Sequence, residues 1–262
     1  MAGVHGDEIN SVEIVRRSVA SRMFEKILRG SVVAIPLLNV YGFNNFSRDV
    51  PDGKDVNRSF PGSPNGSMAA RVAHIFTKNI LPLVDFGVDF HTGGNYNYNY
   101  PQIRYSKNDP RSRELAQAFA APFTVASATI TKSLRKSALD AGKSILVFEG
   151  GENLRFDSFS IEQGLAGIRR LLHAQGMLAE NEPSGESRHI ERSTWLRAAR
   201  PGMFRWIKNS GQFIKSGETL AVINDPYGQD EIPVVSKRDG YIIGHNNNPV
   251  VGQGDALFHI GQ

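Results

Sequence analysis

The chain has 262 residues, of which 40% are hydrophobic and 21% charged, and its formal net charge is +4. This composition is that of an ordinary globular protein with an ample core, and the scattered basic residues exclude an extended nucleic-acid-binding face. Because no stretch approaches the roughly 18 to 20 apolar residues of a membrane helix and no signal-peptide pattern opens the chain, we expect a cytoplasmic protein without membrane or nucleic-acid partners.

The first part of the chain alternates helical and extended patterns. Apolar residues recur at helical spacing over 8–29, and an apolar run over 32–38 predicts a strand. A polar loop rich in Gly, Asn, Asp and Pro follows over 39–64, and loops of this length in compact domains are usually functional or disordered. We then expect helices over 68–80, 110–120, 131–141 and 159–177, and strands over 84–90, 102–105, 122–126 and 144–148.

This alternation predicts an α/β fold, with a mostly parallel or mixed sheet covered by helices. A polar segment over 180–187 is interpreted as a linker between a domain over 1–182 and a second domain over 188–262. In the second domain short apolar runs alternate with Gly-containing turns, which is typical of an all-β fold resembling a biotinyl or lipoyl barrel-sandwich. The hairpin that would carry a modified lysine reads Asn-Asp-Pro-Tyr-Gly-Gln-Asp and has none.

Three residues suggest a metal site. His5 and Glu8 are three apart at the end of a short apolar stretch, and His91 follows a strand-like run in Val-Asp-Phe-His-Thr-Gly-Gly. Three protein ligands with an open fourth position are typical of catalytic zinc, and a chain without cysteine leaves only imidazoles and carboxylates as ligands. We therefore expect one Zn²⁺ per chain, although a lone histidine is more often a hydrogen-bonded structural residue.

Glu149 also follows an apolar strand-like run. Ligands of open α/β sheets gather at the carboxyl ends of strands, so we expect His5, His91 and Glu149 to share one rim. Gly150 and Gly151 would keep the approach to the Glu149 carboxylate open, with Glu152 as the alternative.

The ordered motifs resemble the succinylglutamate desuccinylase and aspartoacylase family of the zinc carboxypeptidase clan. The matching segments are the opening Ala-Gly-Val-His-Gly-Asp-Glu, Asp-Val-Asn-Arg-Ser-Phe-Pro-Gly over 55–62 and Ile-Leu-Val-Phe-Glu-Gly-Gly over 145–151. The resemblance implies that His5, Glu8 and His91 hold zinc and that Glu149 is the general base. It also implies that Asn57 and Arg58 bind a substrate carboxylate. In relatives a longer strand precedes the first ligand, whereas only four residues precede His5, which is compatible with a truncated start.

Other polar residues have weaker signals. Arg48 could stabilise a developing oxyanion, and Arg104 could contact an anionic or polar substrate. Asp7 and Asp89, beside predicted ligands, could orient imidazoles. The tyrosines at 96, 98 and 100 could line a pocket or one exposed strand face, and the remaining histidines are expected to be structural.

The leading hypothesis is zinc-dependent hydrolysis of the amide of a small N-acyl amino acid or related metabolite, with acetyl favoured as the acyl group. A zinc carboxypeptidase acting on peptides is the second hypothesis, and a non-catalytic, metal-free binding protein is the third. A β domain near the active-site rim would narrow access and favour small substrates. A homo-oligomer is compatible with the sequence, which fixes no oligomeric state.

Overall fold

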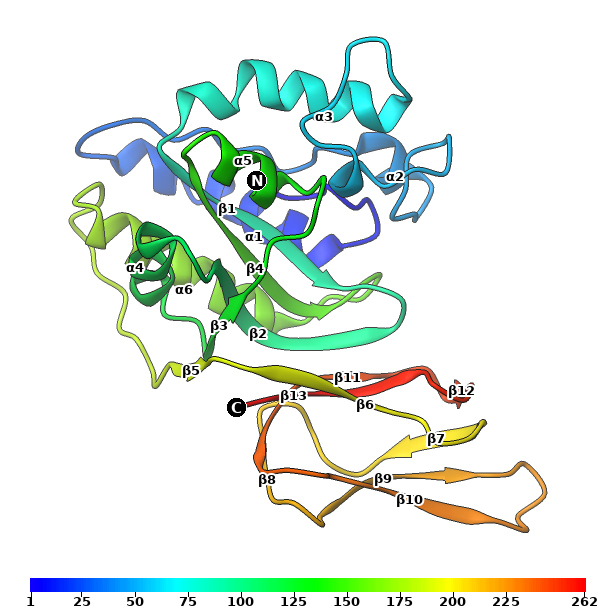
Figure 1. Ribbon diagram of the computed structural model, residues 1–262. Coiled ribbons are helices and arrows are strands. Elements are labelled where there is room, and N and C mark those ends of the chain that lie inside the picture. The colour runs from blue at the N-terminus through cyan, green and yellow to red at the C-terminus, as the bar shows by residue number, and fades with distance from the viewer.

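A computed structural model describes residues 1–262 (Figure 1). We call residues 1–182 the α/β region and residues 188–262 the β region. The helices are α1 (Ile9–Ala20), α2 (Val40–Asn44), α3 (Met68–Asn79), α4 (Pro110–Phe119), α5 (Leu134–Asp140) and α6 (Ser158–Ala174). The strands of the α/β region are β1 (Phe86–Gly93), β2 (Asn97–Ser106), β3 (Phe123–Ser127) and β4 (Ser144–Glu152).

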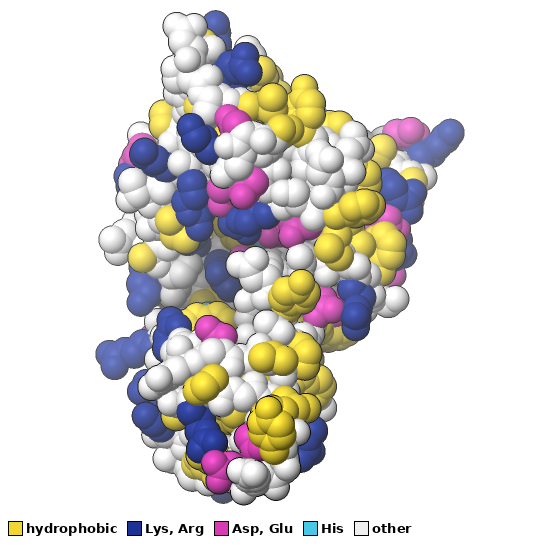
Figure 2. Space-filling view, turned by 90° about the vertical axis from the view of Figure 1, so that its right-hand side faces the viewer, with side chains coloured by type: hydrophobic (Ala, Val, Ile, Leu, Met, Phe, Trp, Pro, Cys, Tyr) yellow, Lys and Arg dark blue, Asp and Glu magenta, His cyan; other side chains and the backbone are white.

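The strands of the β region are β5 (Arg188–Ile190), β6 (Ser193–Arg197), β7 (Gly202–Trp206), β8 (Phe213–Ile214), β9 (Thr219–Asn224), β10 (Glu231–Val235), β11 (Gly240–Asn246), β12 (Val250–Val251) and β13 (Ala256–Gly261). The molecule narrows where the two regions meet (Figure 2). No helix has both the length and the apolar character needed to cross a membrane.

One mixed sheet runs through both regions. Its strand order is β1-β4-β2-β11-β13-β6; β1 and β4 are parallel, whereas β2 is antiparallel to both β4 and β11. A second, antiparallel sheet has the order β10-β9-β7-β12. The predicted α/β class with a mixed sheet is therefore confirmed, with an additional antiparallel sheet. Because β2 pairs with β11, the division into two domains stays a prediction.

The two faces of the sheet bury different helices. On one face Phe90 and Phe148 pack against Phe119 of α4, with the Phe119 and Phe148 ring centroids 5.6 Å apart, and α1 and α6 complete this core. On the other face Ile145 packs among side chains of α3 and α5. Side chains alternate along a strand, so residues such as Asp89 and His91 point to the α3 and α5 face, opposite Phe90. Burial of each such phenylalanine contributes roughly 1.5–3 kcal/mol.

The predicted helix over 8–29 is wrong in its second half. α1 ends at Ala20, and after Arg22, which has a left-handed φ of 55°, a 3-10 turn covers Met23–Lys26. This break directs Met23 into the core, where it is 6% exposed. The helical spacing continued past Ala20, but tertiary packing overrode it.

The predicted strand over 32–38 is not a regular strand. Its backbone instead hydrogen-bonds to the start of the chain: Ala2 N donates to Ile35 O, and Leu38 N donates to Ala2 O. The Met1 amino group in turn donates to Val88 O of β1 at 2.8 Å. Gly3 O still accepts from Asn39 N, but with Gly3 at a left-handed φ of 63° these contacts do not form a regular ladder.

The long loop over 39–64 is held by its own polar side chains. Asn39 Oδ1 accepts from Gly42 N at the start of α2, and Asn39 Nδ2 donates to Arg48 O. Asp55 Oδ1 accepts from Asn57 N at 2.6 Å and begins a 3-10 helix, Val56–Arg58. Short Asn and Asp side chains that bind nearby backbone commonly order such turns.

Candidate active site

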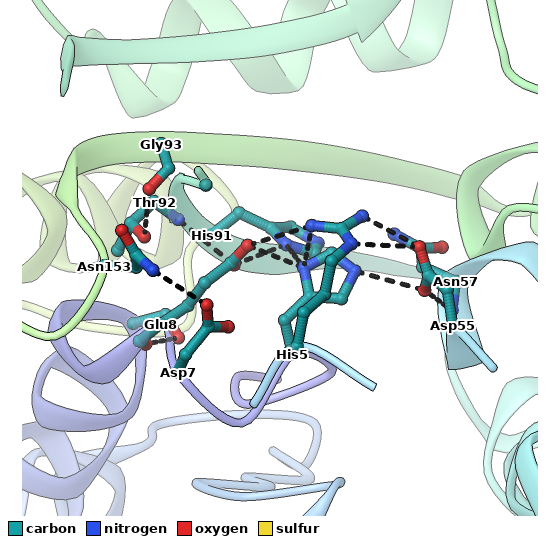
Figure 3. A network of polar contacts seen from close by, with 12 residues as sticks. His5, Asp7, Glu8, Asp55, Asn57, His91, Thr92, Gly93 and Asn153 are labelled. Carbon is teal, nitrogen blue, oxygen red and sulfur yellow. Dashed lines mark hydrogen bonds and ion pairs between the residues drawn. The ribbon is translucent and has the colours of Figure 1, made fainter. Parts of the chain in front are cut away.

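His5, Glu8 and His91 form a buried group whose ligand atoms all lie within 4.8 Å of one another. The His5 Nδ1 atom is 2.6 Å from Glu8 Oε1, the His91 Nδ1 atom is 2.8 Å from Glu8 Oε2, and the two Nδ1 atoms are 3.3 Å apart. Figure 3 shows these side chains converging from the turn before α1 and from β1. The predicted ligands are thus brought together, and this set of donors could hold a metal ion.

Each imidazole is held from behind by a carboxylate. His91 Nε2 lies 2.8 Å from Asp89 Oδ2, and His5 Nε2 lies 3.2 Å from Asp55 Oδ1. This pattern leaves both Nδ1 atoms facing the centre and is the usual support of metal-binding histidines. The prediction for Asp89 agrees with this contact. Asp7, in contrast, is turned away and accepts from Asn153 Nδ2 (Figure 3).

The charges in this group stabilise one another. Burial by itself would lower the pKa of His91, but the Asp89 and Glu8 carboxylates outweigh it and raise that pKa well above its ordinary value. Burial would likewise raise the pKa of Glu8, but His5 and His91 bring it far below its ordinary value. A carboxylate that stays ionised while buried is suited to a cation.

Two glycines make the close packing of this group feasible. A Cβ atom on Gly6 would lie 2.0 Å from backbone atoms of Gly42 and Phe43, so the turn that carries His5 and Glu8 could not rest against α2. A Cβ atom on Gly93 would lie 2.0 Å from Asn97 O, so β1 could not turn directly into β2 after His91. At both points the ligand position depends on a backbone approach that only glycine allows.

Glu149 lies beside the group that His5, Glu8 and His91 form. It is the backbone partner of His91 in the parallel β1–β4 pair, so both side chains point to the same face. Asn99 Nδ2 donates to Glu149 Oε2 at 3.0 Å, and Arg104 Nη1 lies 3.4 Å from Glu149 Oε1. His91 and Glu149 are therefore on one edge as predicted, although each lies within a strand rather than after it.

Glu152, the alternative base, lies elsewhere. Its carboxylate pairs with Arg155 Nε at 3.0 Å and accepts from Asn247 Nδ2 of the β region, and it does not line the cavity. Its side chain helps to join the two regions instead.

The long loop supplies three further predicted site residues, Arg48, Asn57 and Arg58. They lie on the side of the group where His5 is. Arg48 Nη2 lies 2.8 Å from Asp55 Oδ2, and Arg48 Nη1 lies 3.1 Å from His5 Nδ1. Asn57 Oδ1 accepts from Leu134 N, which leaves its amide nitrogen for a ligand. The Arg58 side chain is 44% exposed and reaches into the same space.

A cavity of about 280 Å³ contains all eight predicted site residues among its 19 lining residues. These are His5, Glu8, Arg48, Asn57, Arg58, His91, Arg104 and Glu149. The lining residues that sequence reasoning missed include Asn99, Arg135 and Trp195. The signal for Asn99 was its alternation with tyrosines in 96–100; Arg135 and Trp195 carried none.

Arg135 is a buried guanidinium without a carboxylate partner. It is 8% exposed, and its Nη atoms donate to Ser127 Oγ and Ala128 O. Burial, together with the nearby Arg104 charge, lowers its pKa to about 10. Four arginines and three acidic residues line the cavity, which suits an anionic group.

The tyrosines do not line the cavity. Tyr98 packs against His245 of the β region with ring centroids 5.2 Å apart, Tyr100 packs against Phe123 and Phe159, and Tyr96 is exposed. Strand alternation therefore places Asn97 and Asn99 towards the cavity and the even-numbered tyrosines away from it.

Comparison with known proteins identifies the family. A family model described as the succinylglutamate desuccinylase/aspartoacylase catalytic domain matches residues 1–175. The chain belongs to this family. The resemblance inferred from the motifs is thereby confirmed.

Known relatives match nearly the whole chain. The N-α-acetyl-L-2,4-diaminobutyric acid deacetylase of Halomonas elongata is 26% identical over an alignment of 277 positions, which covers 99% of this chain and 80% of the deacetylase. The structure of a succinylglutamate desuccinylase/aspartoacylase from Rhodobacter sphaeroides superposes with a TM-score of 0.88 at 26% identity, covering 100% of this chain and 84% of that one.

A further structure, the product-bound ectoine utilization protein EutE (DoeB) of Ruegeria pomeroyi, has a TM-score of 0.89 at 24% identity. It covers 100% of this chain and 84% of its own chain, and at this identity the likeness concerns the fold. The β region is therefore part of the architecture that the chain shares with these structures.

Proposed function

We propose that this family member is a zinc-dependent amidohydrolase. It releases an acyl group, for which acetyl is the first candidate, from the amino nitrogen of a small amino acid. The observation that carries the proposal is the pairing of the buried His5, Glu8 and His91 group with Glu149, the in-register neighbour of His91. The carboxylates behind both imidazoles support a resident metal rather than a merely structural cluster.

Nitrogen and carboxylate ligands in a set of three favour zinc, with one coordination position left for water or substrate. Zinc at this point would supply a Lewis acid that polarises the scissile carbonyl and lowers the pKa of water from 15.7 towards about 7. His5, Glu8 and His91 would hold it through the two Nδ1 atoms and the carboxylate.

The chain's own residues would perform the remaining steps. Glu149 accepts a proton from the attacking water as the new C–O bond forms, and it returns that proton to the nitrogen as the C–N bond breaks. Asn99 and Arg104 hold its carboxylate in place. Arg48, whose Nη1 is 3.1 Å from His5 Nδ1, donates to the developing oxyanion.

Asn57 and Arg58 would bind the substrate carboxylate. The guanidinium offers a planar pair of donors, and the amide nitrogen adds a neutral one. Together with Arg135 they make this side of the cavity basic, which supports an amino acid as the amine half. The deacetylase activity of the Halomonas elongata relative makes N-acetyl-L-2,4-diaminobutyrate the first substrate to try.

The test is amine release by zinc-loaded protein from N-acetyl, N-succinyl and N-formyl amino acids, with dipeptides and tripeptides included. We expect hydrolysis of one N-acyl class and no cleavage of peptides, because the cavity is small and is bounded by the β region. Cleavage of peptides would favour a carboxypeptidase. If zinc-loaded protein releases amine from no compound of the panel, the proposed hydrolase activity is wrong.

A further inference from the structure

The active-site cavity receives one residue from the β region, Trp195 of β6. The other lining residues all come from the α/β region, and only Ile130, Val147 and Trp195 among the 19 are hydrophobic. Trp195 is therefore a large apolar surface in an otherwise polar cavity. β6 pairs with β13, and β13 pairs with β11, the strand of the β region that pairs with β2 (Figure 1).

The indole of Trp195 is held in one orientation. It stacks on the imidazole of His259 with ring centroids 4.5 Å apart and an interplanar angle of 7°. The two residues are also backbone partners in the β6–β13 pair. A side chain fixed by both contacts acts as a rigid wall rather than as a mobile cover.

Trp195 and Arg104 line the same cavity. Arg104 Nη1 lies 3.4 Å from Glu149 Oε1, so the indole belongs to the wall of the cavity that holds the proposed base. Burial lowers the pKa of His259 to about 3, so the imidazole that supports the indole is neutral.

The carboxylate-binding pair lines this cavity as well. Asn57 Oδ1 accepts from Leu134 N at the start of α5, and Arg135, the next residue, also lines the cavity. A substrate whose carboxylate lies on Asn57 and Arg58 leaves Arg104 and Trp195 to contact its other groups.

A second cavity adjoins Trp195. This cavity of about 520 Å³, in the β region, shares Trp195 with the active-site cavity, and eight of its 14 lining residues are hydrophobic. Trp195 is the one lining residue that the two cavities have in common.

We propose that Trp195 determines which amino acid is accepted: its indole closes the active-site cavity towards the second cavity and limits the length of the amino acid side chain. This inference rests on the proposed N-acyl amino acid hydrolase and concerns its specificity alone. Glu149 and the metal-binding group are not affected.

The first test compares homologous N-acetyl amino acids that differ by one methylene. The series are 2,4-diaminobutyrate, ornithine and lysine, and aspartate, glutamate and 2-aminoadipate. In Trp195→Ala the ratio of kcat/KM for the longest to the shortest member should rise at least about tenfold, mostly through KM, since one methylene in a closed pocket is worth about 10- to 200-fold. Trp195→Phe should show a smaller rise, and Trp206→Phe, which changes a tryptophan outside the cavity, should show none.

The second test uses fluorescence and needs no turnover. The chain has two tryptophans, so Trp206→Phe leaves Trp195 as the single reporter. In this variant N-acetyl-L-2,4-diaminobutyrate, added to protein with Glu149→Gln to suppress hydrolysis, should change the emission saturably. The same ligand should leave the emission of Trp195→Phe unchanged.

The outcomes separate the two proposals. If the wild-type protein hydrolyses no N-acyl amino acid, both the proposed function and the specificity inference are wrong. If the wild type is active and the folded Trp195→Ala variant has an unchanged ratio of kcat/KM for the longest to the shortest substrate, only the specificity inference is wrong. A cooperative melting transition shows that Trp195→Ala is folded. An emission of Trp195 that does not respond to a ligand known to be hydrolysed overturns it as well.

Discussion

Two pairs of buried histidines in this chain have opposite surroundings. His5 and His91 in the α/β region are 3% and 4% exposed, and His245 and His259 in the β region are 6% and 9% exposed. The first pair contacts Glu8, Asp55 and Asp89. The second pair contacts aromatic rings: the ring centroids of His245 and Trp206 are 4.8 Å apart, and His259 stacks on Trp195.

The difference shows in their protonation. Carboxylates raise the pKa of His91 despite its burial, whereas burial lowers the pKa of His245 to about 4 and that of His259 to about 3. Equal burial therefore gives a group suited to a cation in one region and neutral, structural imidazoles in the other. The carboxylates, rather than the histidines alone, mark the site.

The largest expected effect separates the two pairs by metal content. His91→Ala should lose bound zinc and all measurable turnover, because a three-ligand site loses one ligand. His259→Gln should keep one zinc per chain. Elemental analysis of dialysed protein, with circular dichroism to check folding, measures both. Stoichiometric zinc in folded His91→Ala would rule out the assigned ligands.

The next effect concerns the neighbour of the first pair. Glu149→Gln should keep zinc but reduce kcat by about 10² to 10⁴, the usual contribution of a general base. Glu152→Gln is the matched control, since that carboxylate pairs with Arg155 and Asn247 outside the cavity, and its kcat should change little. A near-normal rate in Glu149→Gln would assign the base elsewhere.

A smaller effect tests whether the carboxylates behind the imidazoles matter. Asp55→Asn weakens the contact with His5 Nε2 and should lower zinc affinity by about 10- to 100-fold. Asp7→Asn, adjacent to Glu8 but bonded to Asn153, should leave zinc affinity unchanged. Competition with a chelator gives both affinities. Equal affinities in the two variants would show that Asp55 does not support the metal.

The last effect concerns stability rather than zinc or turnover and is a pH dependence from the second pair. The pKa of His245 is lowered to about 4 in the folded protein, so the unfolded chain binds more protons between about pH 4 and 6.5. Its contribution to stability is therefore complete above about pH 6.5 and falls by up to about 1.4 kcal/mol per pH unit as the pH drops towards 4.

His245→Gln removes this titration together with the 2.6 Å contact to Ser210. The stability lost on substitution should thus be largest near pH 7 and shrink towards pH 4. Urea unfolding of wild type and variant at several pH values measures the difference. A stability difference that stays constant from pH 7 to pH 4 would contradict the neutral, buried state of His245.

Much of the site could be predicted from the sequence because its signals are local. His5 and Glu8 are three apart on one turn, and they meet at 2.6 Å. His91 and Glu149 each follow an apolar run, and the rule that ligands gather at strand ends placed them together. The helix over 8–29 was predicted too long because periodicity does not register the left-handed break at Arg22.

Spacing and periodicity within short segments were enough to predict the α/β class, the grouping of His5, Glu8 and His91, and the all-β character of residues 188–262. The contact of Asp55 with His5 across 50 positions and the pairing of β2 with β11 in one sheet emerged only from the folded chain. The same is true of the entry of Trp195 into the cavity. Such contacts depend on the strand order and on the sheet face to which a side chain points. Neither can be predicted from the residues that make the contact.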